Sequence, residues 1–340
     1  MNTHFLKTIF KKAPLLILAL CVVALSQGCD NNQSTGPAST APQKKLRLAY
    51  VANTLDDFWS MARLGCDVAA REQGNVEVDF RFPATRTAVM QQELLTQLVA
   101  GGVDGIVISP IDAENQTEFL NTIAAKTLLV CVDSDAEKSR RTCYIGTDNV
   151  AAGKQAGELL KAALPRGGKI ALFVGYANAQ NTKDRIQGIQ EALAGSNLQI
   201  IDTLADEAMN TVAWKNAQDA LTKYPDLAGM VGIYGYHGPA ILTAVRGAGK
   251  VGLVKIVCFD EDSGTLAGIT AGDIYGTIIQ NPYKFGYDPV TRMDKYLGGD
   301  KTQLAAGKIL IPTRAVTKDN IESFQASRKT VLELQQAEGQ

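Results

Sequence analysis

The residues of this chain that could do chemistry include two aspartates, each placed at the end of an apolar run. Residues 130–135 read Val-Cys-Val-Asp-Ser-Asp, and residues 257–262 repeat the pattern as Val-Cys-Phe-Asp-Glu-Asp. Each segment is typical of a buried strand that ends in an aspartate, Asp133 or Asp260. Open parallel sheets bind ligands at the carboxyl ends of their strands, so the matched pair favours a ligand site. Each aspartate taken alone would more simply cap the turn or helix that follows it.

Other kinds of chemistry find little support in the sequence. Residues 247–252 fit the G-x-G-x-x-G pattern, but they end a predicted helix and precede a strand, the reverse of the order that a dinucleotide site needs. His4 and His237 are the only histidines, which excludes a multi-histidine metal site. Asp133 and Asp260 could in principle hydrolyse a glycoside, but a binding role already explains them. We therefore expect no metal, no cofactor and no catalytic residue.

The elements that must position these residues follow from an alternation of short apolar runs with segments of helical period, which starts at Lys45. The predicted strands are 46–52, 76–82, 105–109, 127–132 and 143–146, with helices at 57–72, 88–100, 114–125 and 150–163. A second series has strands at 169–175, 198–203, 230–234 and 254–259, with helices at 184–194, 212–223 and 239–247. Apolar strands alternating with helices predict parallel sheets covered on both faces, and two series predict two doubly wound α/β lobes.

The N-terminus carries an export pattern. Lysines precede an apolar run at residues 13–25, which is too short for a transmembrane helix and typical of a signal peptide. The small residue before Cys29 resembles a bacterial lipoprotein signal, which predicts a signal peptide over 1–28 and a lipid on Cys29. Ordinary secretory cleavage is the alternative. Residues 29–44 are rich in Ser, Thr, Pro and amides and predict a flexible tether to a membrane in the cell envelope.

The charge and the cysteines limit the kinds of partner and of site that the chain can have. The formal net charge is −1 with the two signs interspersed, which argues against a nucleic-acid partner. Beyond the signal region the cysteines are Cys66, Cys131, Cys143 and Cys258, and no two of them have the C-x-x-C spacing of a redox or zinc site. Cys131 and Cys143 lie in consecutive predicted strands, so they either form a disulfide in an oxidising compartment or stay buried as free thiols.

Several segments, in order along the chain from about Lys45 to Ile311, give a more specific result. They are YVANTLDDFW at 50–59, DGIVISP at 104–110, YIGTDN at 144–149, RIQG at 185–188 and VCFD at 257–260. With this order and spacing the chain resembles the type I periplasmic sugar-binding proteins, a group that includes the ribose-binding proteins.

The resemblance implies two lobes joined by three crossovers, near Thr147, Gln280 and residues 311–313. The N-terminal lobe would consist of residues 45–147 and 281–311, and the C-terminal lobe of residues 148–280 and 312–340. The lobes would close around a sugar, with hinge residues at the ends of elements absorbing the motion. Residues 318–340 predict a helix that packs on the second lobe.

The resemblance also implies a set of ligand-binding residues. The polar and aromatic cluster after the family's first strand matches Asp57, Phe58 and Trp59, and the aspartate after the fourth strand matches Asp133. The arginine of R-x-x-G matches Arg185, the second-lobe aspartate matches Asp260, and the hinge glutamine matches Gln280. Carboxylates accept hydrogen bonds from sugar hydroxyls, guanidinium donates to them, and aromatic rings cover the C–H faces of a sugar.

Two departures from the ribose group matter. Ser134 stands where an arginine is common, and Tyr234 stands where an asparagine is expected, so ribose itself is not implied. Tyr234 would either stack on or donate to the sugar, or pack in the core. Asn181 is a further candidate contact, although capping a helix is the simpler role for it.

The resulting prediction is a monomeric, lipid-anchored substrate-binding component of a sugar ABC importer that docks to permease subunits. A sensor-coupled receptor for a sugar or a furanosyl signal is the alternative. A glycoside-processing enzyme is less favoured. A transcriptional repressor of the same architecture is excluded, because an export signal stands where its DNA-binding helices would be.

Overall fold

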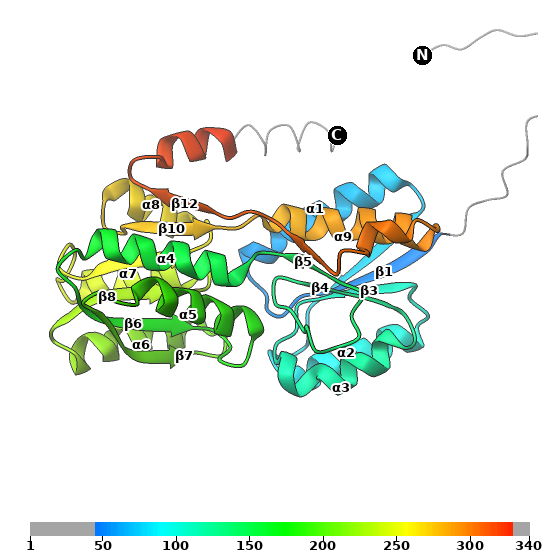
Figure 1. The fold of residues 1–340 in the computed structure, drawn as a ribbon, viewed down its shortest axis with the longest axis horizontal. Helices are drawn as coiled ribbons and strands as arrows, with labels where there is room; N and C mark the ends of the chain where they lie inside the picture. The colour runs from blue at the N-terminus through cyan, green and yellow to red at the C-terminus, as the bar shows by residue number, and fades with distance from the viewer. Residues whose placement is uncertain (1–44, 329–340) are drawn as a thin grey trace, which may run out of the picture. The chain divides into compact units, whose positions relative to one another are not determined.

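The computed structural model of this protein describes residues 45–328, which contain two six-stranded sheets (Figure 1). The first sheet has the order β11-β5-β4-β3-β1-β2, with β1 (Leu46–Val51), β2 (Val76–Arg81), β3 (Gly105–Ile108), β4 (Leu128–Val132), β5 (Cys143–Gly146) and β11 (Lys308–Leu310). The second has the order β12-β10-β9-β8-β6-β7, with β6 (Gly168–Val174), β7 (Leu198–Ala205), β8 (Leu227–Gly232), β9 (Lys255–Phe259), β10 (Gly276–Ile279) and β12 (Arg314–Thr317). All pairings are parallel except that of β10 with β12.

Helices cover both faces of each sheet. The first sheet packs against α1 (Asp57–Gln73) and α9 (Pro282–Leu297) on one face and against α2 (Ala88–Ala100) and α3 (Ala113–Ala124) on the other, and the 3₁₀ helix η1 (Lys301–Leu304) follows α9. The second sheet packs against α4 (Asn149–Ala163) and α5 (Gln180–Leu193) on one face and against α6 (Asn210–Lys223), α7 (His237–Gly247) and α8 (Ser263–Ala271) on the other. The predicted fold class, two doubly wound α/β lobes, is confirmed.

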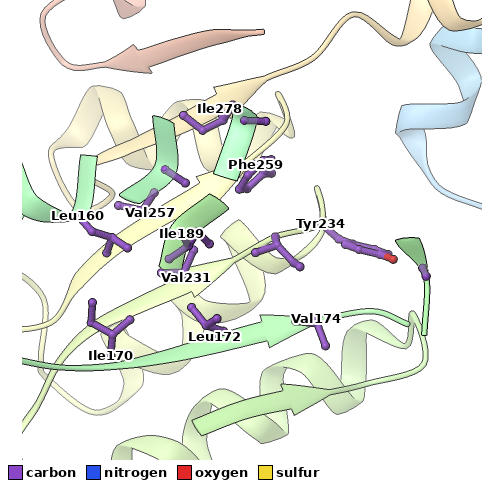
Figure 2. Packing of buried hydrophobic residues seen from close by; sticks show 14 of the residues in the cluster. Leu160, Ile170, Leu172, Val174, Ile189, Val231, Tyr234, Val257, Phe259 and Ile278 are labelled. Atoms are coloured by element: carbon purple, nitrogen blue, oxygen red, sulfur yellow. The ribbon is translucent and has the colours of Figure 1, made fainter. Parts of the chain in front are cut away.

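The central strands are buried on both faces, and their side chains divide between two cores by the alternation of the pleat. Ile170, Leu172 and Val174 of β6 join the core under α4 and α5, as Figure 2 shows. Ala171 and Phe173 of the same strand join the core on the opposite face. This double burial explains why the strands read as continuous apolar runs rather than as alternating patterns.

The chain crosses between the two sheets three times. The first crossing lies between Gly146 of β5 and the start of α4, and the second between Ile279 of β10 and α9. The third joins β11 to β12 at residues 311–313. A last helical segment at 321–328 places Ile321 and Phe324 in a core of the second sheet.

The cysteines resolve the alternative left open by the sequence. Cys66, Cys131, Cys143 and Cys258 are buried free thiols. Cys143 pairs in register with Val130, one residue before Cys131, so the two cysteine side chains point to opposite faces of the sheet. Cys131 accordingly lies in one core and Cys143 in the other, and the predicted disulfide alternative is wrong.

Within residues 45–328, no helix combines the length and the apolar character needed to cross a bilayer. The predicted signal peptide, Cys29, the predicted tether and residues 329–340 of the helix predicted at the C-terminus all lie outside these residues.

Candidate functional site

A cavity of about 640 Å³, called here the cleft, lies between loops at the carboxyl ends of strands from both sheets. A much smaller space of about 30 Å³, called here the floor, continues from it. The residues that line both are Thr54, Asp56, Phe58, Gly235, Asp260 and Gln280. Loops after β1, β8, β9 and β10 therefore contribute to one site, as the rule for open parallel sheets predicts.

The two aspartates of the repeated pattern occupy equivalent positions. Asp133 follows β4 with φ 57°, and Asp260 follows β9 with φ 69°. Left-handed backbone at a residue other than glycine is uncommon, and aspartate tolerates it better than most residues. Neither residue caps a helix, since the cap of α8 is Asp262. The expectation that they cap the following element, which was the simpler one for each alone, is wrong.

Asp133 is fully occupied by protein donors. Its Oδ2 accepts hydrogen bonds from the Ser109 hydroxyl at 2.8 Å and from the Asn53 amide at 3.4 Å. The Asn181 amide nitrogen lies 3.2 and 3.1 Å from its two oxygens, and Arg185 Nη2 lies 3.9 Å away. Burial raises the pKa of Asp133, although Arg185 and these donors counteract that effect. Asp133 holds the floor together and keeps little acceptor capacity for a ligand.

Asp260 is engaged on one oxygen only. Its Oδ1 accepts a hydrogen bond of 2.8 Å from the Gln280 amide, and the Gln280 carbonyl oxygen accepts one of 2.8 Å from the Thr147 hydroxyl. This chain links the two crossings that carry Thr147 and Gln280. Burial, together with the charge of Asp133, raises the pKa of Asp260 to about 6, despite the opposing effect of Arg185.

Asp56, and not only the predicted Asp57, faces the site. Asp56 is the N-cap of α1 and accepts from the backbone N–H of Trp59, so the start of the helix fixes its carboxylate. Burial and the charge of Asp260 raise its pKa to about 7. Asp57 is exposed and lines only the cleft, whereas Asp56 lines both the cleft and the floor. Asp56 and Asp57 are adjacent, and the residue at which α1 begins decides which of the two carboxylates faces the site. The sequence alone does not fix that residue.

Arg185 lies on α5 and is buried to 1% exposure. Its Nε donates to Asn149 Oδ1 at 2.9 Å, its Nη1 donates to the carbonyl oxygen of Ile233 at 2.6 Å, and its guanidinium stacks over Phe259 at 4.6 Å. Its Nη2 lines the floor without a hydrogen-bond partner among the described residues. A buried donor of this kind is costly unless a ligand satisfies it.

The two predicted aromatic residues of the first lobe differ in burial. Trp59 is buried, lines the floor and donates its indole N–H to Asn53 Oδ1 at 3.0 Å. Phe58 is half-buried, lines both the cleft and the floor, and packs edge-on against Trp59. Phe58 is therefore the aromatic ring available to a ligand from the first lobe.

Tyr234 lies beyond the end of β8, and Figure 2 shows its ring at the edge of the aliphatic core with the hydroxyl turned away from it. The hydroxyl is hydrogen-bonded to the Thr182 hydroxyl at 3.1 Å and lines the floor. Tyr234 thus has its ring in the core, as one of the two predictions had it, and its hydroxyl at the floor; its contact with a ligand stays a prediction.

Asn181 does not cap a helix, so that expectation is wrong. The N-terminal amides of α5 are capped from the other lobe instead, since Ser134 Oγ accepts from the backbone N–H groups of Gln180 at 3.2 Å and Asn181 at 3.5 Å. The sequence had marked Ser134 only as a departure from the ribose group. It gives no signal that a residue after β4 would meet a helix that starts 46 residues later.

A buried polar triad supports the second-lobe wall of the cleft. His237 Nδ1 accepts from the backbone N–H of Tyr234 at 3.0 Å, which leaves the hydrogen on Nε2. That nitrogen lies 2.7 Å from Asp206 Oδ2, and the Tyr236 hydroxyl lies 2.6 Å from Oδ1. His237 is fully buried, so it is a structural histidine that holds Tyr236 against the cleft.

The site has no features of a metal centre. Across residues 45–328, no three His, Cys, Asp or Glu side chains are grouped so that they could hold a metal ion. Asn53, Asp56, Ser109 and Asn149 are site residues that sequence reasoning missed. They are short polar residues at strand and helix ends, a pattern too common to single them out without the tertiary structure.

Comparison with known proteins places this geometry in context. A family model described as a periplasmic binding protein domain matches residues 48–301. The ribose import binding protein RbsB of Salmonella typhimurium is 27% identical over 266 residues, which cover 76% of this chain and 87% of that protein.

Solved structures agree with this match. A solute-binding protein of an ABC transporter from Burkholderia graminis, in complex with D-arabinose, is 26% identical with a TM-score of 0.77, covering 82% of this chain and 97% of its own. One from Agrobacterium vitis, bound with α-D-tagatopyranose, is 25% identical with a TM-score of 0.77, covering 84% and 98%.

Proposed function

The chain belongs to the periplasmic binding protein family, and we propose that it binds a monosaccharide between its two lobes as the substrate-binding component of an ABC importer. The observation that carries this proposal is the cleft of about 640 Å³, lined from both lobes by carboxylates, an amide and an aromatic ring. A sugar needs hydrogen-bond partners for its hydroxyls and an apolar surface for its C–H face, and this lining offers both.

The residues that we assign to the ligand are those that line the floor or the cleft and keep unused hydrogen-bonding capacity or apolar surface. They are Asp56, Asp57, Phe58, Arg185, Tyr234, Asp260 and Gln280. Asp133 and Trp59, which the resemblance also implied, and Asn181, the further candidate, would hold the floor in shape around them. The proposed lobes are 45–147 with 281–311 and 148–280 with 312–340, and closure would turn about the three crossings between the sheets.

The cellular setting extends the proposal. The family is periplasmic, and we infer that Cys29 is lipidated after removal of residues 1–28, so that the protein works as a monomer at the membrane that carries the permease. The name of the Salmonella relative, an import protein, favours transport over the sensor-coupled role. The family binds solutes, and we infer that this member has no catalytic residue.

A ligand screen on the full-length protein, purified in mild detergent, tests the proposal. Thermal unfolding is followed with a panel of aldoses, ketoses and sugar alcohols at millimolar concentration. A ligand that binds only the folded state stabilises it by about 2.7 kcal/mol at 100 times its dissociation constant. We expect a clear shift with at least one monosaccharide, and no shift with any sugar would overturn the proposal.

A matched pair of variants locates the binding. Phe58→Ala removes the ring that lines the cleft, and we expect the affinity for the sugar to fall about tenfold. Phe82→Ala removes a ring of similar partial burial that packs on Phe80 away from the cleft, so the affinity should hold. Equal affinities in the two variants would place the sugar elsewhere.

A further inference from the structure

Two carboxylates that line both the cleft and the floor, Asp56 and Asp260, keep unused hydrogen-bond acceptors. Asp260 is 8% exposed and binds protein through Oδ1 alone, so Oδ2 has no hydrogen-bond donor among residues 45–328. Asp56 accepts only from the backbone amides that begin α1. Both line the cleft and the floor, from opposite lobes. Asp133, in contrast, has three protein donors, and one of them, the Asn181 amide, lies near both of its oxygens.

The positive charges that line the site are directed elsewhere. Arg328 lies 3.4 Å from Glu261, and Arg185 is held by Asn149 and Ile233 with its free Nη2 nearest to Asp133. Arg86 is exposed in the loop before α2. Within the described part of the chain, neither Asp56 nor Asp260 forms an ion pair with a lysine or arginine. Buried carboxylates normally have such a partner. The charge of Arg185 acts on Asp260 from beyond ion-pair distance, and Asp56 has no cation beside it among these residues.

The approach to this pair is open. Gly235 lies beside Asp260, and a Cβ atom there would come 3.5 Å from Asp260 Oδ2, so the absence of a side chain leaves the carboxylate uncovered on that side. Arg185, which lines the floor but not the cleft, has in Nη2 a buried donor without an acceptor among residues 45–328. A ligand that brings a cation to the two carboxylates and a hydroxyl acceptor to Arg185 would satisfy both.

We propose that the ligand is a polyhydroxylated cation, an amino sugar or an aminocyclitol, whose ammonium group lies between Asp56 and Asp260 while a hydroxyl accepts from Arg185. This proposal rests on the proposed function, since it names the class of sugar that the same cleft takes. An ammonium group offers three donors and one positive charge, which matches two carboxylates with free oxygens. A neutral sugar would bring no positive charge to either carboxylate.

The proposal has a pH signature. The pKa values of Asp56 and Asp260 are raised to about 7 and about 6, so at pH 5 both carboxyls are largely protonated in the free protein. Binding a cation favours the ionised forms, and affinity for the amine must rise between pH 5 and pH 7. Near pH 8 an amine flanked by oxygen substituents begins to lose its own proton, as an α-amino group does, so the rise ends there.

Calorimetry on the full-length protein in mild detergent provides the test. D-glucosamine, D-galactosamine and D-mannosamine are each titrated beside the neutral parent hexose at pH 7 and at pH 5. We expect at least one amine to bind tenfold or more tightly than its parent at pH 7, with a smaller ratio at pH 5. Asp56→Asn should bring the ratio towards one, and asparagine preserves the helix cap.

The control and the contrary outcomes separate the two proposals. Asp67→Asn removes a carboxylate from an exposed position of α1 that does not line the cleft, and it should leave the ratio unchanged. A neutral hexose that binds as tightly as its amine overturns the cationic ligand but keeps the sugar-binding function. Failure of every amine and every neutral sugar to bind overturns both.

Discussion

At the scale of single residues, two aspartates with nearly the same sequence surroundings have different roles. Both follow a buried strand in left-handed backbone, but Asp133 is saturated by donors from three elements, whereas Asp260 keeps a free oxygen. The difference arises from neighbours distant in the chain, Ser109, Asn53 and Asn181. Burial raises the pKa of both carboxyls, and for Asp260, which has one hydrogen-bond donor, the buried charge costs folding stability.

Replacement of Asp260 by asparagine should stabilise the ligand-free protein in a pH-dependent way. The folded-state pKa of about 6 exceeds the unfolded value of about 3.9, so the unfolded state loses its proton first and wild-type stability falls as pH rises from about 4 to 7. Asparagine lacks this charge and tolerates the left-handed backbone. We expect a gain on the order of 2 kcal/mol at pH 8 and almost none at pH 4.

Urea unfolding of wild type and Asp260→Asn at the two pH values measures this gain. The removal of the charge should also lower the pKa of Asp56, whose elevation comes partly from Asp260. A gain of the same size at both pH values would contradict the assignment of the raised pKa to Asp260.

At the scale of elements, two helix pairs, α4 with α5 and α1 with α9, position residues of the site, and in each pair the two backbones are in close contact. A Cβ at Gly188 of α5 would lie 2.1 Å from the carbonyl oxygen of Val150 in α4, and a Cβ at Gly286 of α9 would lie 1.8 Å from that of Ala62 in α1. Asp56 caps α1, and Arg185 lies on α5 one turn before Gly188. The close approach of each pair therefore sets where the charged groups meet the floor.

Gly188→Ala should destabilise the protein, although alanine is the better helix former by about 1 kcal/mol. The added methyl group must push α5 from α4, and overpacking of this kind costs about 1–3 kcal/mol. Arg185 would move with α5, so ligand affinity should fall as well. Chemical unfolding and ligand titration of the same variant measure the two effects.

Gly247→Ala is the matched control on α7. Its added methyl group meets no atom within 4 Å, so the variant should be neutral or slightly stabilised with unchanged affinity. If Gly188→Ala behaved like Gly247→Ala, the close helix contact would not be what positions Arg185.

At the scale of the whole molecule, the two lobes share polar groups as well as crossings. Ser134 of the first lobe caps α5 of the second, and the Tyr176 hydroxyl donates to the carbonyl oxygen of Asn53 at 3.3 Å. The chain from Thr147 through Gln280 to Asp260 connects the crossings with the site itself. A ligand that engages Asp260 is therefore linked to the segments about which the lobes would turn.

Ser134→Ala removes the cap that the first lobe provides for α5. We expect a loss of about 1 kcal/mol in stability and about fivefold faster hydrogen exchange at the amides of Gln180 and Asn181, because they lose their acceptor. Hydrogen-exchange mass spectrometry resolves this segment.

Thr87→Ala is the comparison for this variant, since Thr87 caps α2 within the first lobe by accepting from the N–H of Met90. Its stability loss should be similar, with exchange at Gln180 and Asn181 unchanged. Faster exchange at these amides in both variants would indicate a global effect rather than the loss of a contact between lobes.

The sequence by itself determined the fold class, most of the elements and several strand ends that meet at the site. Periodicity reports burial on one or both faces, and the strands, buried on both, were recognised because their apolar runs are continuous. The elements between Phe259 and residue 318, including α9 and β12, were not separately predicted. A proline lies inside α9, and β12 has one buried residue in four.

Only the tertiary structure decided which polar groups remain free. Asp56 turns inward while Asp57 is exposed, Asp133 is saturated while Asp260 is not, and Ser134 caps a helix of the other lobe. Each of these facts depends on hydrogen-bond partners that come from segments far apart in the chain. No local sequence pattern predicts that these segments will lie close together. The position of a donor relative to an acceptor is fixed by the packing of whole helices and sheets, which the sequence specifies only through the complete fold.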